Sequence, residues 1–195
     1  MTPTGIVTRD GVEQPADVVV WATGFHVTDS YTYVDIKGAG GEDLVDRWNR
    51  EGIAAHRGIA VAGMPNLFFL LGPNTALGHN SVVFMIESQI RYVAQAIAAA
   101  DAAGAKALAP TRRAQDDFNT QLQHDLAGTV FNTGGCQSWY LDAHGVNRTL
   151  WGRDDLAVLA GDPAFRARRV RVQPVVRATR HHKWLCCAAS QPPQL

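Results

Sequence analysis

The feature that most constrains this chain is the stretch FFLLGPNTALGHNSVVFMIESQ, residues 68–89, in which a short loop joins two apolar segments. The first segment is continuously apolar up to Gly72, as expected of a strand buried on both faces. The second has apolar residues at helical spacing, on one expected helix face: Val82, Ile86, Ile90, Val93 and Ile97. The stretch therefore predicts a strand, a loop and a helix, a unit typical of α/β proteins.

This loop stands where α/β proteins often bind ligands. In open α/β sheets, ligands sit at the carboxyl ends of the strands, where the chain crosses to a helix. Gly72 would let a ligand approach the backbone closely, and the first turn of the helix offers free N–H groups and a positive dipole end. An ordinary turn, in which Gly72 and Pro73 only bend the chain, explains the same residues. The pattern alone leaves both interpretations open.

Patterns on either side of this stretch predict further elements. Asp10-Gly11 predicts a hairpin turn, and the apolar run at residues 17–22 predicts a strand buried on both faces. Helices are expected at residues 41–52 and 110–128, because each segment has apolar residues at helical spacing and ends at glycine. Residues 136–151 predict two strands joined by a turn. One stripe of the second helix is formed by Phe118, Leu122 and Leu126.

The helix that follows the loop has two further expected contacts. Asn80 or Ser81 can cap its first turn. Glu87 and Arg91 are four residues apart, so their side chains are expected to pair on its flank. In the C-terminal part of the chain, the expected strands meet at a turn placed at His144-Gly145.

Composition argues against several classes of protein. The 195 residues are 46% hydrophobic, enough for one core of moderate size, yet no run of about eighteen apolar residues could span a membrane. The opening residues show no basic patch followed by an apolar stretch, so we expect no secretory signal and a cytoplasmic location. The three cysteines do not make a disulfide framework.

The net charge of zero conceals a step near residue 152. Residues 1–151 hold 10 Lys and Arg against 15 Asp and Glu, whereas residues 152–195 hold 8 against 3. A basic tail can mark a nucleic-acid-binding arm, but no nucleic-acid-binding fold accompanies it, and we expect no such partner. The run HHKWLCC, residues 181–187, contains metal-ligand residue types. Its adjacent pairs lack the spacing of a zinc site, so no metal is expected.

Three separated motifs give the chain a resemblance to a known family. They are DVVVWATGF from Asp17, GMPNLFFLLGPNTALGHNSVVFMIESQIRYV from Gly63, and CQSWYLD with GVNRTLW between Cys136 and Trp151. In this order and spacing they resemble the C-terminal part of flavin-containing monooxygenases. The nearest group is the Baeyer–Villiger type, with its relatives that act at nitrogen or sulfur. The resemblance runs from Val18 to Trp151.

The resemblance implies a fold, an activity and cofactors. The expected fold is α/β, part of a protein with two dinucleotide-binding domains for FAD and NADPH. Residues 1–151 would be the C-terminal part of the FAD-binding domain, and residues 152–195 a divergent, poorly ordered basic tail. In this family NADPH reduces the flavin, which then activates O2. The oxygen is inserted into a ketone or transferred to a soft nitrogen or sulfur nucleophile of a small-molecule substrate.

The resemblance also implies cofactor-binding residues, although no catalytic residue. The loop at residues 72–75 would lie close to the flavin ring, and residues 79–81 would start the helix behind it. Backbone N–H groups and Asn74 would satisfy ring carbonyls that would otherwise be buried without a partner. The expected cofactor-binding residues are Thr23, Gly24, Gly72, Pro73, Asn74, Thr75, His79, Asn80 and Ser81.

The Gly-rich phosphate-binding loops of the family have no counterpart in this sequence. One candidate, GAGGED from Gly38, has Asp43 where the third glycine should stand. We therefore expect the chain alone to bind no flavin and to be inert in NADPH oxidation. A separately encoded N-terminal part would complete the cofactor site. The alternative is a catalytically inactive remnant or an interaction module that binds no flavin.

The sequence after Trp151 departs from the family. The family continues with Pro-Gly-Thr-Thr-Trp, whereas this chain continues with GRDDLAVLAGDPA. With suitably chosen codons, a shift of reading frame restores Gly-Thr-Thr-Trp at this position. An out-of-frame, GC-rich tail would also be rich in Arg, Ala and Pro, which fits the charge step. A frameshift is therefore our hypothesis for the tail.

Overall fold

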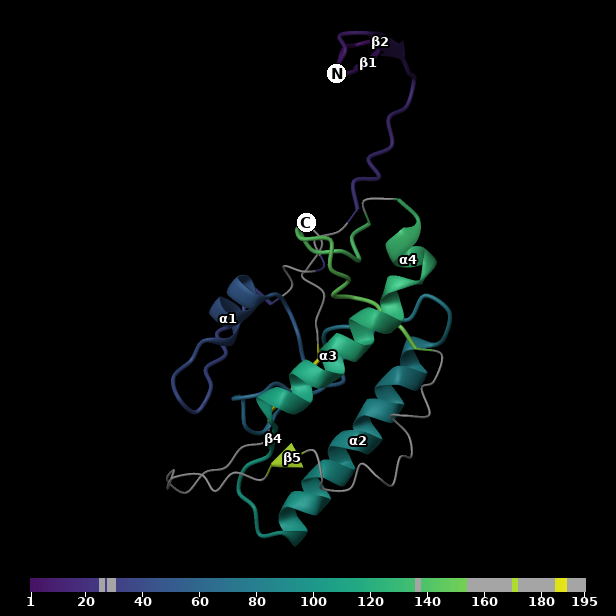
Figure 1. Ribbon diagram of the computed structural model, residues 1–195. Coiled ribbons are helices and arrows are strands. Elements are labelled where there is room, and N and C mark those ends of the chain that lie inside the picture. Colours follow the sequence, from purple (N-terminus) through teal and green to yellow (C-terminus); the bar gives the residue numbers. More distant parts are fainter. Residues whose placement is uncertain (25–26, 28–30, 136–137, 154–169, 172–184, 189–195) are drawn as a thin grey trace.

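Helices and short strand pairs make up the computed structural model of the chain (Figure 1). The structure describes residues 1–24, 27, 31–135, 138–153, 170–171 and 185–188. The helices are α1 (Leu44–Glu51), α2 (Val82–Ala102), α3 (Arg112–Ala127) and α4 (Val130–Thr133). The strands are β1 (Gly5–Val7), β2 (Glu13–Pro15), β3 (Leu67–Leu70), β4 (Ala109–Pro110), β5 (Val170–Arg171) and β6 (Leu185–Ala188). Within the described residues the strands pair only in twos.

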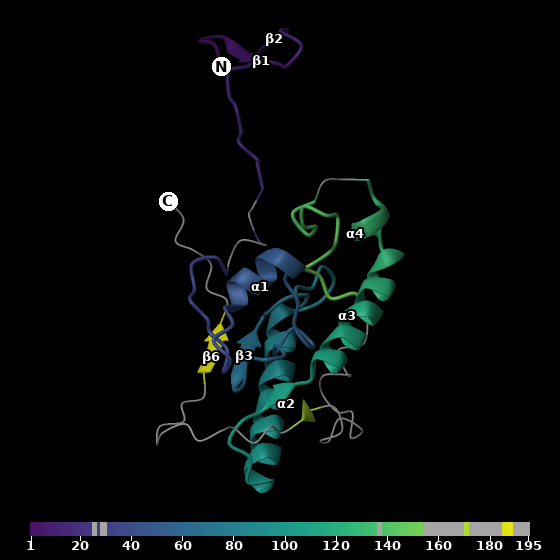
Figure 2. The same ribbon diagram turned by 60° about the vertical axis from the view of Figure 1, so that its left-hand side comes forward.

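The predicted succession of strand, loop and helix is confirmed by β3, the loop after it and α2. Strand β3 pairs in parallel with β6, from Leu67 opposite Leu185 to Leu70 opposite Ala188, and Figure 2 shows the two strands side by side. Strands β1 and β2 pair antiparallel, as do β4 and β5. The chain is therefore a mixed α/β structure. Most of residues 152–195 lie outside the described residues, and their poor order stays a prediction.

The N-terminal hairpin stands apart from the helices at the end of an extended connector, residues 16–24 (Figures 1 and 2). It confirms the turn predicted at Asp10-Gly11. The buried strand predicted in the connector is wrong, because Val18, Val20 and Trp21 are 78%, 82% and 69% exposed. The connector pairs with no described strand, so these apolar side chains have no sheet against which to be buried.

The helices predicted at residues 41–52 and 110–128 are confirmed as α1 and α3, although α1 begins only at Leu44. Capping explains their ends. The Asp43 carboxylate accepts hydrogen bonds from the N–H groups of Val45 and Asp46, at 2.8 and 3.1 Å, and α1 ends at Gly52. At the start of α3, the Thr111 hydroxyl accepts a hydrogen bond from an N–H of the first turn. Each cap satisfies N–H groups that have no partner within the helix.

The buried face predicted for α2 is wrong. Val82 and Ile90 are exposed, and only Val93 and Ile97 of the predicted face pack against a core cluster. The ion pair expected between Glu87 and Arg91 is also not found among the described residues. The helix buries another face because its contacts come from β3 and from Trp151, which lie far from it in the sequence. The side chains that α2 buries are Met85, Ser88, Gln89, Tyr92 and Ala100.

Three clusters of buried apolar side chains hold the helical part together. The first joins β3 to α2 and includes Ile59, Phe68, Met85, Tyr92 and Trp151. The second lies around α1 and includes Leu44, Trp48, Val61, Met64 and Phe69. The third joins α3 to the end of the segment 147–151 through Leu122, Leu126 and Leu150. Among the described residues, no helix is both apolar enough and long enough to cross a membrane.

Candidate functional site

The loop after β3 divides into a buried part, residues 72–75, and an exposed part, residues 78–81. In the buried part, the backbone N–H of Asn74 donates to the carbonyl of Arg148 at 2.9 Å. The Asn74 side-chain nitrogen donates to the carbonyls of Asn147 and Leu150, at 2.8 and 3.1 Å. Asn74 also has a left-handed backbone, with φ of 56°, which asparagine tolerates better than most residues. It therefore ties the loop to the segment 147–150.

A close approach of two glycines explains the small residues of the buried part. A Cβ atom at Gly72 would overlap the carbonyl oxygen of Gly58, and a Cβ atom at Gly58 would overlap the side chain of Thr75. The Thr75 hydroxyl in turn donates to the carbonyl of Gly72 at 2.6 Å. Packing within this chain is thus sufficient to require Gly72. Contact of residues 72–75 with a cofactor stays a prediction.

The exposed part of the loop leads into α2. His79, Asn80 and Ser81 are all exposed, and the Asn80 side chain accepts a hydrogen bond only from the next N–H, at 2.7 Å. Ser81 occupies the cap position of α2, but its side chain makes no capping hydrogen bond. The first N–H groups of α2 are therefore without a side-chain cap. The apolar residues that follow, Val82, Val83 and Phe84, are exposed as well.

The other two predicted cofactor-binding residues lie elsewhere. Thr23 and Gly24 are exposed in the connector from the hairpin, and no hydrogen bond among the described residues joins them to the loop at 72–75. Gly24 has a φ of 83° and open space around its Cα. The structure therefore brings Gly72, Pro73, Asn74 and Thr75 together in a buried loop, and separates them from the remaining predicted residues.

A buried polar side chain of α2 supports the loop from behind. Gln89 of α2 is fully buried, and its side-chain oxygen accepts a hydrogen bond from the N–H of Leu71 at 2.9 Å. Its side-chain nitrogen and the hydroxyl of Ser88 have no hydrogen-bond partner among the described residues. The hydrogen bond to Leu71, which has φ of 57°, holds the end of β3 in its left-handed turn.

The turn that carries the segment 147–150 is held by Asp142. Its carboxylate accepts hydrogen bonds from the N–H groups of His144 and Val146 and from Nε of Arg148, the last at 2.9 Å. Burial opposes ionisation of Asp142, but these hydrogen bonds outweigh it and lower the pKa of the carboxyl. The turn predicted at His144-Gly145 is confirmed. The two flanking segments share only one bridge, between Leu141 and Asn147, and Leu150 forms a parallel bridge with Ala76. Residues 136–137 lie outside the described residues.

The glycine-rich stretch from Gly38 forms a turn. The N–H of Gly38 donates to the carbonyl of Glu42, and residues 37 and 43 form an antiparallel bridge. Asp43 then caps α1 and takes up the N–H groups that a phosphate would need. This stretch therefore forms no phosphate cradle.

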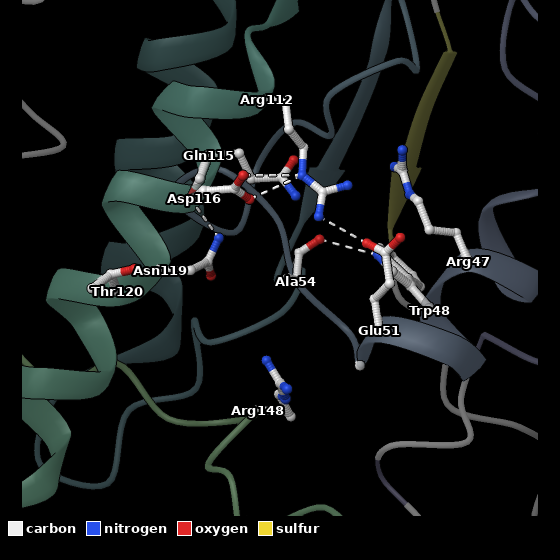
Figure 3. A pocket seen from close by; sticks show the side chains of 11 residues that line it. Arg47, Trp48, Glu51, Ala54, Arg112, Gln115, Asp116, Asn119, Thr120 and Arg148 are labelled. Atoms are coloured by element: carbon white, nitrogen blue, oxygen red, sulfur yellow. Dashed lines mark hydrogen bonds and ion pairs between the residues drawn. The ribbon is translucent and has the colours of Figure 1, made fainter.

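Apart from the loop at residues 72–75, a hollow of about 300 Å³ lies between α1, α3 and Arg148 (Figure 3). Arg112 lines this hollow and forms two ion pairs, with Glu51 of α1 at 2.9 Å and with Asp116 of α3 at 3.0 Å. The hydrogen bond that Arg112 donates to the Glu51 carboxylate is the main cause that raises the pKa of Arg112. The arginines in its lining are at positions 47, 112 and 148, which lie far apart in the sequence. No local sequence motif could therefore have predicted this hollow.

Similarity searches relate the chain to known proteins, although no family model matches it. A Baeyer–Villiger monooxygenase of Streptomyces coelicolor is 44% identical over 147 residues, which are 75% of this chain and 28% of the relative. A Baeyer–Villiger monooxygenase of Pseudomonas aeruginosa is 43% identical over 152 residues, 77% of this chain and 29% of the relative. The chain is related to Baeyer–Villiger monooxygenases. It spans less than a third of the length of these relatives.

The fold agrees with this relationship to Baeyer–Villiger monooxygenases. The structure of cyclohexanone monooxygenase from Rhodococcus sp. Phi1, solved with bound NADP+, superimposes with a TM-score of 0.65 at 31% sequence identity. The superposition covers 88% of this chain and 33% of that protein. The predicted resemblance to flavin monooxygenases is thus confirmed, and the mixed α/β structure corresponds to part of such an enzyme.

Proposed function

We propose that this chain forms part of an FAD- and NADPH-dependent monooxygenase, which inserts oxygen into a ketone or oxygenates a soft nitrogen or sulfur nucleophile. The observation that carries this proposal is the 44% identity to a Baeyer–Villiger monooxygenase over three quarters of the chain. Because Asp43 caps α1 at the end of the glycine-rich stretch from Gly38, the phosphates of FAD and NADPH would be held by a separate nucleotide-binding part. O2 and a small-molecule substrate would meet at the assembled site.

The chain's own contribution would be made at the start of α2. When bound there, FAD supplies the oxygen-activating chemistry. The uncapped N–H groups of the first turn and the positive end of the helix suit the carbonyl edge of the flavin ring. Val82, Val83 and Phe84 would exclude water beside it. The buried loop at residues 72–75 would serve as the rigid base that positions this helix start.

Two exposed apolar surfaces support the need for a nucleotide-binding part. One is in the connector, at Val18, Val20 and Trp21. The other is on α2, at Val82, Val83, Phe84 and Ile90. Burial of such surfaces against a protein partner would be favourable, at about 25 cal/mol per Å² of apolar area. The segment 17–22 is rich in β-formers and extended, which suits pairing with a partner's sheet.

Reconstitution tests this function. The chain would be co-expressed with the part of the Streptomyces coelicolor relative that it does not match, and the pair purified by gel filtration. We expect a flavin absorption band to co-elute with the pair and NADPH oxidation to appear, whereas the chain alone stays colourless and inert. The competing function, an interaction module that binds no flavin, predicts that the two parts associate without retaining FAD.

A further inference from the structure

We propose that Gln89 sets the rotation of α2 on β3 and thereby positions the start of α2 for the flavin. Gln89 is a positioning residue, because it acts through the helix and does not touch the ring. Its role rests on the function proposed above, since the cofactor site concerned is the one at the start of α2.

The buried face of α2 is not its most apolar face. Four large apolar side chains of the helix are left 39–62% exposed, namely Val82, Val83, Phe84 and Ile90. Ser88 and Gln89 are buried instead, at 1% and 0% exposure. The hydrophobic effect favours a rotation that turns large apolar side chains inward and polar ones outward. Apolar burial alone therefore does not account for the rotation of this helix.

One directional contact does account for it. Strand β3 and α2 lie against each other (Figure 2), and Oε1 of Gln89 accepts a hydrogen bond from the N–H of Leu71, directly after the strand, at 2.9 Å. The donor is fixed in the backbone, so this bond forms only when the Gln89 side chain points at the end of β3. The apolar cluster that joins the two elements is not directional. The hydrogen bond thus fixes a rotation that apolar packing leaves open.

The arrangement around Gln89 is costly. Nε2 of Gln89 and Oγ of Ser88 are buried and have no hydrogen-bond partner among the described residues. Leu71 has φ of 57°, a left-handed conformation that leucine rarely adopts. Backbone strain and unpaired buried groups persist where the surrounding structure enforces them, and they gather at functional sites. Stability alone therefore does not explain why Gln89 is buried here.

Gln89 controls the start of α2 from a distance. It lies eight residues beyond Ser81, the cap residue, which corresponds to about 12 Å along the helix. Because a helix turns as a unit, a change of rotation at Gln89 is carried to the first turn. Val83 and the uncapped N–H groups would then face away from the position proposed for the flavin ring. Binding depends steeply on such placement.

Amide hydrogen exchange in the full 195-residue chain and flavin titration of the reconstituted pair test this role. Gln89→Met keeps the size of the side chain but removes the acceptor. We expect the Leu71 amide to exchange about tenfold faster and flavin to bind about tenfold more weakly. Ser88→Ala is the matched control, because Ser88 is the neighbouring buried polar residue and has no bond to the loop. It should change neither quantity.

A conservative variant should restore the protection of Leu71. Gln89→Glu retains an acceptor oxygen, and burial keeps the introduced carboxyl protonated at about pH 5. At that pH we expect the Leu71 amide of this variant to exchange within about threefold of the wild-type rate. Circular dichroism identifies a variant that does not fold. If Gln89→Met does not fold, Gln89→Asn takes its place, because its shorter side chain does not reach Leu71.

The outcomes separate this role from the proposed function. Equal exchange at Leu71 in Gln89→Met and Ser88→Ala would show that Gln89 does not hold the end of β3. Faster exchange with unchanged flavin affinity would reduce Gln89 to a structural role, and either result overturns the proposal. A wild-type pair that retains no flavin would contradict the proposed function, and exchange at Leu71 would still decide whether Gln89 fixes the helix.

Discussion

The two parts of the segment that joins β3 to α2 differ in what satisfies their polar groups. Residues 72–75 are buried, and their hydrogen bonds end on residues of the same chain. Residues 79–84 are exposed, their helix N–H groups lack a side-chain cap, and their apolar side chains face solvent. One stretch of Gly, Pro, Asn and Ser thus contains a buried part that packs against its own chain and an exposed part with unsatisfied polar groups. A bound ligand would explain the exposed part better than the buried part.

Gly58→Ala should have the largest effect, because it forces the buried part of the loop apart. Gly58 has φ of 66°, and an added Cβ would overlap Thr75. Left-handed strain and overpacking together should lower the free energy of unfolding by about 3 kcal/mol or more. Urea denaturation measures the loss.

Gly104→Ala is the matched control for this variant. Gly104 also has positive φ, of 63°, but no atom lies within 4 Å of an added Cβ. It should lose only the strain, about 1–2 kcal/mol. If the two variants lose the same amount, the contact between Gly58 and the loop is not a packing constraint, and the contrast between the two parts of the loop is weakened.

Asn74→Ala should be the next most damaging change. It removes both side-chain hydrogen bonds to the segment 147–150 and replaces asparagine at a left-handed position, for an expected loss of about 2–3 kcal/mol. Asn80→Ala, in the exposed part, should cost about 0.5 kcal/mol or less. If thermal or urea unfolding shows that the two variants lose equal free energy of unfolding, the buried and exposed parts of the loop do not differ in their contribution to stability.

Acid should lower the free energy of unfolding by protonating Asp142, which holds the turn before the segment 147–150. The pKa of its carboxyl is lower in the folded chain than its ordinary value of 3.8. Its stabilising contribution is therefore present above that value and is lost as the pH falls through the lower folded pKa. We expect the free energy of unfolding to fall below about pH 4, and Asp142→Asn to reduce this dependence. A wild-type profile matched by that of Asp142→Asn between pH 2 and 4 would contradict the role of this turn.

A change in the exposed part should have the smallest effect on the chain itself. Val83 is 62% exposed on the first turn of α2, so Val83→Ser should alter the free energy of unfolding by about 0.5 kcal/mol or less. In the reconstituted pair it should weaken flavin binding about tenfold, through lost apolar contact. Val7→Ser, on the separate hairpin, is the control and should change neither quantity. Unchanged flavin affinity in Val83→Ser would argue against a flavin at the start of α2.

Features held by interactions between residues close in the sequence could be predicted, whereas features that depend on distant segments could not. The limits of α1 and α3 were predictable because Asp43 and Thr111 cap N–H groups only two or three residues away. The buried face of α2 was not, because Met85 and Tyr92 are buried by β3 and by Trp151, which lie far away in the sequence. The strand predicted at residues 17–22 failed for the same reason, since it needs a neighbouring strand.

The candidate sites divide in the same way. The loop at residues 72–75 could be singled out from its residues, but its bonds to residues 147–150 could not, since more than seventy positions separate Asn74 from its acceptors. The hollow of Figure 3 left no local signal, because its arginines lie on α1, on α3 and at position 148.

By itself, the sequence determined the order of strand, loop and helix, the helix ends, the turns at Asp10-Gly11 and near Gly145, and the relationship to Baeyer–Villiger monooxygenases. These depend on caps, turns and spacing that act over a few residues. The tertiary structure alone decided which face of α2 is buried, that Gly72 and Asn74 pack against their own chain, and that Arg47, Arg112 and Arg148 line one hollow. Burial and hydrogen-bond partners are set by which distant segments come together, and a local pattern does not encode that choice.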